Sequence, residues 1–136
     1  MQINFFKQEG RVPVTVMKLA GNLDASNYTE VIAKAQNAYD DGARDLLIDL
    51  SEVPYVSSAG LMSLHTTGLI FAGHSMKSKG SGRPISRSVN AQNEKAVRQH
   101  MKLLNPQPAV EQLLDVVGLI QFLDIYTEFE AAVQSF

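Results

Sequence analysis

Residues 46–71 contain a short apolar run, a turn with two hydroxyl groups and an amphipathic stretch, and this order constrains the fold more than any other part of the chain. Four of the five residues from Leu46 to Leu50 are apolar, which is typical of a strand covered on both faces. Beyond the turn, apolar and small residues recur at helical spacing at Leu61, Leu64, Gly68 and Phe71. The segment therefore predicts a buried strand that leads directly into a helix.

Ser57 and Ser58 stand at the expected start of this helix, and we expect one of the two hydroxyl groups to cap it. A hydroxyl at this position is partly exposed and faces backbone N–H groups that have no partner within the helix. It also lies at the positive end of the helix dipole, where a phosphate group is stabilised. The same pattern is equally compatible with a helix cap that has no regulatory role.

The rest of the chain alternates between strand and helix patterns. In chain order the predicted strands cover 3–6, 12–19, 46–50, 101–104 and 122–126, and the predicted helices cover 28–39, 58–73, 110–117 and 127–136. The first two strands are close enough in sequence to form a hairpin. Because strands and helices then alternate, we expect an α/β domain with a mixed, mostly parallel sheet of about five strands and about four helices.

Composition limits the class of protein. With 136 residues, of which 45% are hydrophobic, the chain is expected to form one domain over residues 1–136. It contains no cysteine, which excludes disulfides and thiolate chemistry. Its apolar runs are too short to span a membrane and it begins without a signal pattern, so we expect a soluble cytoplasmic protein.

The net charge of −2 conceals a basic segment at about 75–99, which carries +5 against −7 on the remainder. Residues 79–84 have the composition of a flexible loop, while 91–99 are compatible with one or two helical turns. The segment is interpreted either as a solvated loop without a partner or as a contact for an acidic protein surface. It contains no aromatic residue for stacking on bases, so we expect no nucleic-acid binding.

No other pattern indicates a metal, cofactor or catalytic site. The histidines His65, His74 and His100 are widely spaced and have no cysteine beside them, so we expect neither a metal site nor a bound cofactor. Asp24 and Asp49 are compatible with a catalytic carboxylate pair, but each is equally interpreted as a cap or strand-end group that accepts from backbone N–H groups.

Three parts of the chain resemble one family. The run Asp49-Leu-Ser-Glu-Val-Pro-Tyr-Val-Ser-Ser-Ala-Gly-Leu61 resembles the phosphorylation segment of STAS domains, specifically of the bacterial anti-sigma factor antagonists. Gly21-x-Leu-Asp-Ala25 and Asn105-Pro106 with the helix after it resemble the same family. The resemblance covers most of the chain outside residues 75–99, and it implies the STAS fold.

In this family the phosphate acceptor is the second residue of an Asp-Ser-(Ser/Thr)-Gly-Leu motif. The resemblance therefore implies Ser58 as the acceptor, with Ser57 as the alternative, and Ser57 stands where the family usually has an acidic residue. It also implies a partner-binding surface around the acceptor, made of Asp24, Ser57, Ser58, Ala59, Gly60, Leu61 and Met62. Met62 and Leu69 lie off the apolar stripe, where each is expected either to contact a partner or to pack in the core.

The function that the resemblance implies is that of a non-enzymatic switch. The unphosphorylated protein would bind an anti-sigma factor that is also a serine kinase, and so free a sigma factor. The kinase would inactivate it by phosphorylating Ser58, and a serine phosphatase would restore it.

Two other hypotheses remain open from the sequence. One is a STAS-type scaffold or adaptor subunit that is not phosphorylated, in a signalling or transporter assembly. The other is a small-molecule-binding or enzymatic domain that uses Asp24, Ser57 and Ser58, for which the sequence offers no convincing base. The oligomeric state is not indicated.

Overall fold

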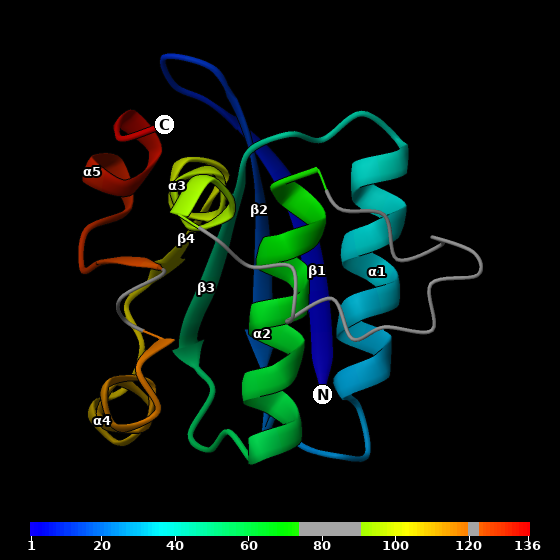
Figure 1. Cartoon of the computed structure of the whole chain (residues 1–136), viewed down its shortest axis with the longest axis vertical. Helices are drawn as coiled ribbons and strands as arrows, with labels where there is room; N and C mark the ends of the chain where they lie inside the picture. The colour runs from blue at the N-terminus through cyan, green and yellow to red at the C-terminus, as the bar shows by residue number, and fades with distance from the viewer. Residues whose placement is uncertain (74–90, 120–122) are drawn as a thin grey trace.

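A computed structural model of the chain describes residues 1–73, 91–119 and 123–136 (Figure 1). The described strands are β1 (Gln2–Glu9), β2 (Pro13–Ala20), β3 (Leu46–Glu52), β4 (Met101–Leu104) and β5 (Asp124–Tyr126). The described helices are α1 (Tyr28–Asp40), α2 (Ser58–Phe71), α3 (Ala91–His100), α4 (Pro108–Val116) and α5 (Phe129–Gln134). The predicted α/β class is therefore confirmed.

The five strands form one mixed sheet in the order β1-β2-β3-β4-β5. The first two form the predicted antiparallel hairpin, with Gln2 opposite Ala20 and Glu9 opposite Pro13. All other neighbouring strands are parallel, which requires a crossover connection between each pair. The sheet is therefore mostly parallel, as predicted, and its β1 edge is antiparallel.

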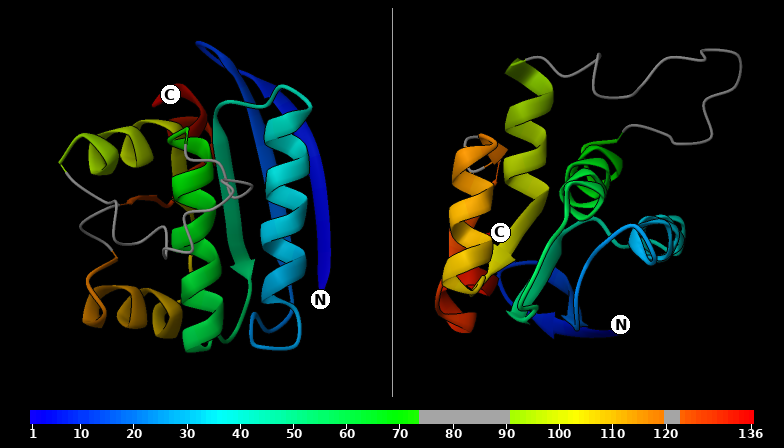
Figure 2. Two further views of the ribbon diagram at one scale, coloured as in Figure 1. Left: turned by 45° about the vertical axis from the view of Figure 1, so that its right-hand side comes forward. Right: turned by 90° about the horizontal axis from the view of Figure 1, so that it is seen from below.

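Apolar side chains alternate between the two faces of the sheet because successive residues of a strand point to opposite sides. On one face Met17, Ile48 and Leu103 belong to a large core with residues of α1, α2, α3 and α4. On the other face Val16 and Leu47 pack with residues of α5 in a smaller core. Figures 1 and 2 show α1 and α2 side by side along the first face.

The described residues contain five helices where about four were predicted, and the additional helix is α3. It occupies residues 91–100 and so overlaps the end of the segment at about 75–99 that we expected to be a basic insert. Val97 of α3 is buried. Its side chain lies beside Gly68 of α2, and it is the first group that a Cβ atom on Gly68 would meet. Val97 is the one large apolar residue in the sequence of 91–100, so the apolar periodicity of this helix is weak. This explains why fewer helices were predicted than the structure contains. The part of the insert at 75–90, including the predicted loop at 79–84, lies outside the described residues.

The predicted strand at 122–126 is shorter in the structure, because β5 begins at Asp124. Residue 122 lies outside the described part of the chain. Within the described residues, no helix has the length and apolar content needed to cross a membrane.

Candidate functional site

The candidate site lies where β2 and β3 end, because two parallel neighbours bring their following loops together. The pairing continues beyond the strands through an isolated bridge between Leu23 and Val56. Three further backbone hydrogen bonds join the loops, from Gly21 N–H to Glu52 C=O (3.0 Å), from Leu23 N–H to Tyr55 C=O (2.9 Å) and from Ser57 N–H to Leu23 C=O (2.9 Å). Asp24, next to Leu23, is thereby placed beside the start of α2.

The two adjacent serines have different roles in the structure. Ser57 is the N-cap of α2, and its Oγ accepts a hydrogen bond from the Gly60 N–H at 3.2 Å. This confirms that one of the two hydroxyl groups caps the helix. Ser58 is the first residue of the helix and is exposed, and within the described part of the chain its hydroxyl makes no hydrogen bond. Ser58 is therefore the hydroxyl that an approaching protein can reach.

The beginning of α2 favours negative charge. The N–H groups of Ser58 and Ala59 precede the first intrahelical hydrogen bond of the helix, which Leu61 N–H donates to Ser57 C=O at 2.9 Å. The first turn of α2 contains no acidic side chain that would repel an anion. Together with the helix dipole, these groups would stabilise a phosphate on the neighbouring hydroxyl.

Asp24 holds the loop between β2 and α1 in a local turn. Its Oδ1 accepts hydrogen bonds from the hydroxyl and the backbone N–H of Ser26, the latter at 2.9 Å. These bonds to the hydroxyl and the N–H of Ser26 lower the pKa of the Asp24 carboxyl. Asn27, the N-cap residue of α1, accepts at Oδ1 from the Asp24 N–H at 2.9 Å. The carboxylate is thus ionised and oriented at neutral pH.

Asp49 has a separate, local role. Its Oδ1 accepts from the Ser51 N–H at 2.9 Å, on the strand that leads to the site. Each of the two aspartates thus accepts from a backbone N–H, as one of the two sequence interpretations expected. Their places differ from that interpretation, because the cap of α1 is Asn27 and Asp49 lies within β3 and not at its end.

The expected partner-binding residues divide into a surface set and a supporting set. Ser58 and Met62 are exposed, and the Met62 side chain is 59% exposed. Ser57, Ala59 and Asp24 are partly exposed. Gly60 and Leu61 are buried beneath these exposed residues, so they offer a partner little surface.

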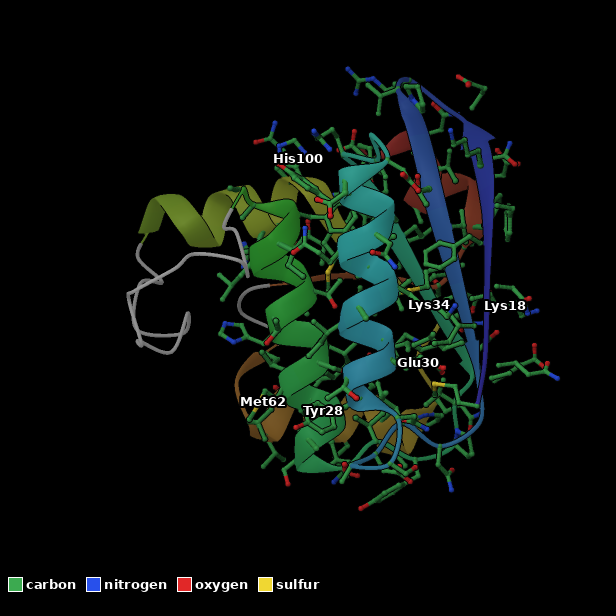
Figure 3. All side chains as sticks on the ribbon, turned by 90° about the vertical axis from the view of Figure 1, so that its right-hand side faces the viewer. Lys18, Tyr28, Glu30, Lys34, Met62 and His100 are labelled. Atoms are coloured by element: carbon green, nitrogen blue, oxygen red, sulfur yellow. The ribbon has the colours of Figure 1, made fainter. Side chains whose placement is uncertain are left out.

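Two apolar residues, Leu69 and Tyr55, differ in their exposure. Leu69 is only 1% exposed and belongs to the core, because α2 is packed against α1 and also against α3. Of the two alternatives expected for Leu69, core packing is therefore the one that the structure shows. Tyr55, in contrast, is 51% exposed in the loop before α2, and the sequence analysis did not single it out. The sequence feature that could have indicated an exposed Tyr55 is its position directly after Pro54 in a predicted turn. Figure 3 shows Met62 on the side of α2 that faces away from α1.

The two histidines that the structure describes, His65 and His100, lie in different parts of the fold. His65 is partly buried in α2, and burial lowers the pKa of its imidazole, which is neutral at pH 7. His100 Nδ1 lies 2.9 Å from Asp45 Oδ1, next to the opposite ends of β3 and β4. His74 lies outside the described residues. Within the described ranges there is no group of three or more His, Asp or Glu side chains arranged to hold a metal ion.

The different roles of the two serines are testable by their effects on stability. Ser57→Ala removes the helix cap and is expected to lower the free energy of unfolding by about 1 kcal/mol. Ser58→Ala removes an exposed hydroxyl and is expected to change it by less than about 0.5 kcal/mol. Urea unfolding followed by circular dichroism measures both values. Equal effects of the two substitutions would contradict the assignment of the cap to Ser57.

The chain was compared with known families and structures. The family model described as "Mlab, STAS domain" matches residues 7–74, which is half of the chain and includes β2, β3, α1 and α2. The chain therefore belongs to the STAS domain family. No curated protein matches it in sequence.

Several solved structures are similar to the chain over almost all of its length. A putative anti-sigma factor antagonist from Thermotoga maritima is 14% identical, with a TM-score of 0.69, covering 97% of this chain and 92% of that one. An anti-sigma factor antagonist from Mycobacterium paratuberculosis is 17% identical, with a TM-score of 0.65, covering 98% and 93%. The anti-sigma factor antagonist SpoIIAA in its unphosphorylated form is 21% identical, with a TM-score of 0.57, covering 94% and 92%. At these identities the similarity establishes the fold.

Proposed function

We propose that this STAS domain is an anti-sigma factor antagonist whose binding to its partner is controlled by phosphorylation of Ser58. The observation that carries the proposal is the exposed Ser58 hydroxyl at the start of α2, beside a neighbour that already caps the helix. The similar solved structures support the general role, and they include SpoIIAA in a phosphorylated form, with a TM-score of 0.52 and 21% identity. In this proposal the protein acts in the cytoplasm and is a substrate of its partner, with no catalytic activity of its own.

The proposed cycle has two covalent steps. An anti-sigma factor that is also a serine kinase transfers the γ-phosphoryl group of ATP to the Ser58 oxygen, with loss of the hydroxyl proton and release of ADP. A serine phosphatase then hydrolyses the phosphate ester to serine and inorganic phosphate. After this hydrolysis the unphosphorylated protein binds the kinase again and so frees a sigma factor.

The phosphate would switch binding without unfolding the domain. It adds a charge of about −1.5 to −2 at a helix start that favours negative charge, so α2 should tolerate it. Met62 and Tyr55 supply exposed apolar surface near the same point. A partner that covers this surface would have to bury the phosphate, which is unfavourable unless the partner pairs it.

The experiment that tests the proposal is intact-mass analysis after incubation with ATP and the candidate anti-sigma kinases of the host. We expect the wild type and Ser57→Ala to gain one phosphate, and Ser58→Ala to gain none. A phosphate on Ser58→Ala that is absent from Ser57→Ala would move the acceptor to Ser57. Failure of a kinase that binds the protein to phosphorylate it would overturn the switch.

A second candidate function is a STAS adaptor subunit that is not phosphorylated, in a signalling or transporter assembly. One observation favours it: Ser57 occupies the place of the family's usual acidic residue and is used as a helix cap. This function predicts a stoichiometric complex whose affinity is unchanged in Ser58→Asp.

A further inference from the structure

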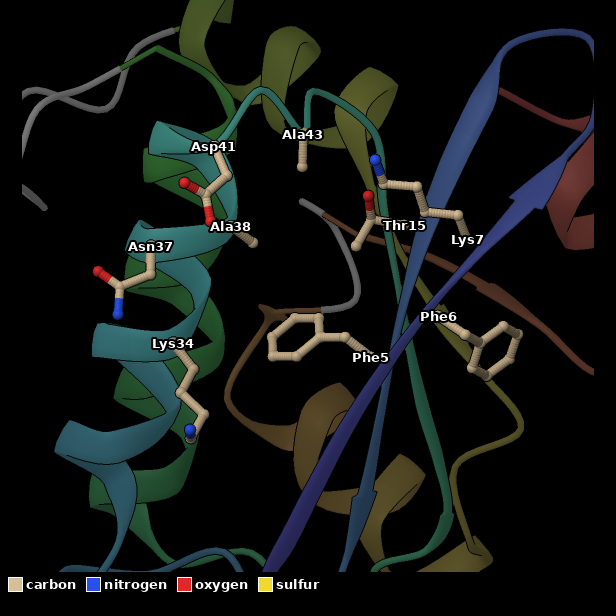
Figure 4. A pocket seen from close by; sticks show the side chains of 9 residues that line it. All are labelled: Phe5, Phe6, Lys7, Thr15, Lys34, Asn37, Ala38, Asp41 and Ala43. Atoms are coloured by element: carbon tan, nitrogen blue, oxygen red, sulfur yellow. The ribbon is translucent and has the colours of Figure 1, made fainter.

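A groove lies between the edge strand β1 and helix α1, away from the start of α2. It has a volume of about 460 Å³, within the range of small-molecule sites in proteins. Its wall opposite β1 comes from the second half of α1, including Lys34 and Ala38, and from Asp41 directly after the helix. The candidate phosphorylation site, in contrast, adjoins the loop before that helix. Figure 4 shows the groove between the strand and the helix.

Phe5 gives the groove an aromatic surface. Its side chain is 39% exposed, although its partner in the hairpin, Met17, is completely buried. Figure 4 shows the Phe5 ring pointing from β1 into the space beside α1, while Phe6 points to the other side of the strand. There Phe6 lies near Phe129 of α5, with ring centroids 6.3 Å apart. The ring of Phe5 is thus available to stack on a ligand in the groove.

Two lysines give the groove its charge. Lys7 on β1 and Lys34 on α1 both line it, and within the described residues neither has a carboxylate oxygen within 4 Å. Other lysines do have such partners: Lys18 Nζ is 2.9 Å from a Glu52 oxygen and Lys102 Nζ is 3.6 Å from an Asp124 oxygen. With Asp41 also in the lining, the groove has a formal charge of +1. Its charge is complementary to that of a monoanion.

We propose that this groove binds a small organic anion with a flat aromatic body and one carboxylate. The aromatic body would stack on Phe5, between the strand and the small side chain of Ala38. The carboxylate would pair with the Lys34 ammonium, with Lys7 at the opposite wall. The proposal does not depend on phosphorylation of Ser58, because it rests on different residues on a different part of the surface.

The test is a titration of the full chain with 2-naphthoate, followed by amide chemical shifts in two-dimensional NMR. The neutral 2-naphthamide, which has nearly the same shape, is titrated in parallel. We expect both to shift the amides of Phe5, Thr15 and Ala38, and naphthoate to bind about fivefold more tightly, which is the effect of one partly exposed ion pair. Lys34→Gln should remove this difference, and Phe5→Ala should weaken both ligands.

Two variants outside the groove serve as controls. Lys18→Gln removes an exposed lysine and Tyr55→Ala removes an exposed aromatic ring, and neither residue lines the groove. Both variants should retain the preference for naphthoate. Equal affinity for the acid and the amide, or shifts that lie outside the groove, would overturn the proposal. So would concentration-dependent changes in β1 without ligand that Phe5→Ala abolishes, since they would make this surface an interface between copies of the chain.

Discussion

Gly60→Ala is expected to lower the free energy of unfolding by about 3 kcal/mol, equivalent to roughly 10 °C in the melting temperature. A Cβ atom at Gly60 would lie 2.5 Å from the Leu23 carbonyl oxygen and 2.8 Å from Cγ1 of Val56. The carbonyl cannot move away freely, because it accepts the hydrogen bond from the Ser57 N–H. The substitution therefore has to separate the two loops that form the candidate site. Thermal and urea unfolding followed by circular dichroism measure the loss.

Gly68→Ala is the matched control, because it makes the same change in the same helix. Its Cβ would meet Cγ1 of Val97 at 2.8 Å, and the next atom is the flexible Met101 sulfur at 3.7 Å. These are ends of side chains, which can shift, and alanine is favoured over glycine in a helix by up to about 1 kcal/mol. We expect a net change of less than about 1 kcal/mol. If Gly60→Ala is no more destabilising than Gly68→Ala, this would contradict the close approach of Gly60 to the carbonyl group of Leu23.

The parts of the fold that were predictable from sequence depend on local periodicity. The run at 46–50 and the stripe from Leu61 to Phe71 each determine one element from its own residues, and both elements are present in the structure as β3 and α2. The hairpin of β1 and β2 follows in the same way from β-branched residues around a short turn. The order of these elements was sufficient to give the fold class.

The finer features of the site depend on contacts between segments, which local patterns do not contain. Either Ser57 or Ser58 satisfies the sequence preference for a cap, and the choice is set by where the backbone of Leu23 holds the loop. The burial of Leu69 depends on the packing of α2 against its neighbouring helices, which the residues of α2 alone do not determine. The groove beside Phe5 likewise exists only because α1 leaves part of β1 uncovered.

If the proposed function is right, phosphorylation of Ser58 is expected to weaken binding to the proposed anti-sigma kinase at least about 100-fold, equivalent to about 2.8 kcal/mol. The reason is that the exposed hydroxyl and the exposed side chains of Met62 and Tyr55 would be covered together by the partner. A desolvated phosphate without a cationic partner costs more than this interface surface provides. Isothermal titration calorimetry with the phosphorylated and unphosphorylated forms measures the difference.

Substitutions separate the effect of charge at this point from a change in the fold. Ser58→Asp should weaken binding in the same direction as the phosphate, and Ser58→Ala should bind like the unphosphorylated wild type. Ala131→Asp adds the same charge to the first turns of α5, on the other face of the sheet, and should leave binding unchanged. Met62→Asp should weaken binding even when Ser58 is unmodified, because it puts a charge into the same covered surface. If Ala131→Asp weakens binding as much as Ser58→Asp, the repulsion is a property of the whole domain's charge, and the start of α2 is not the place where the partner binds.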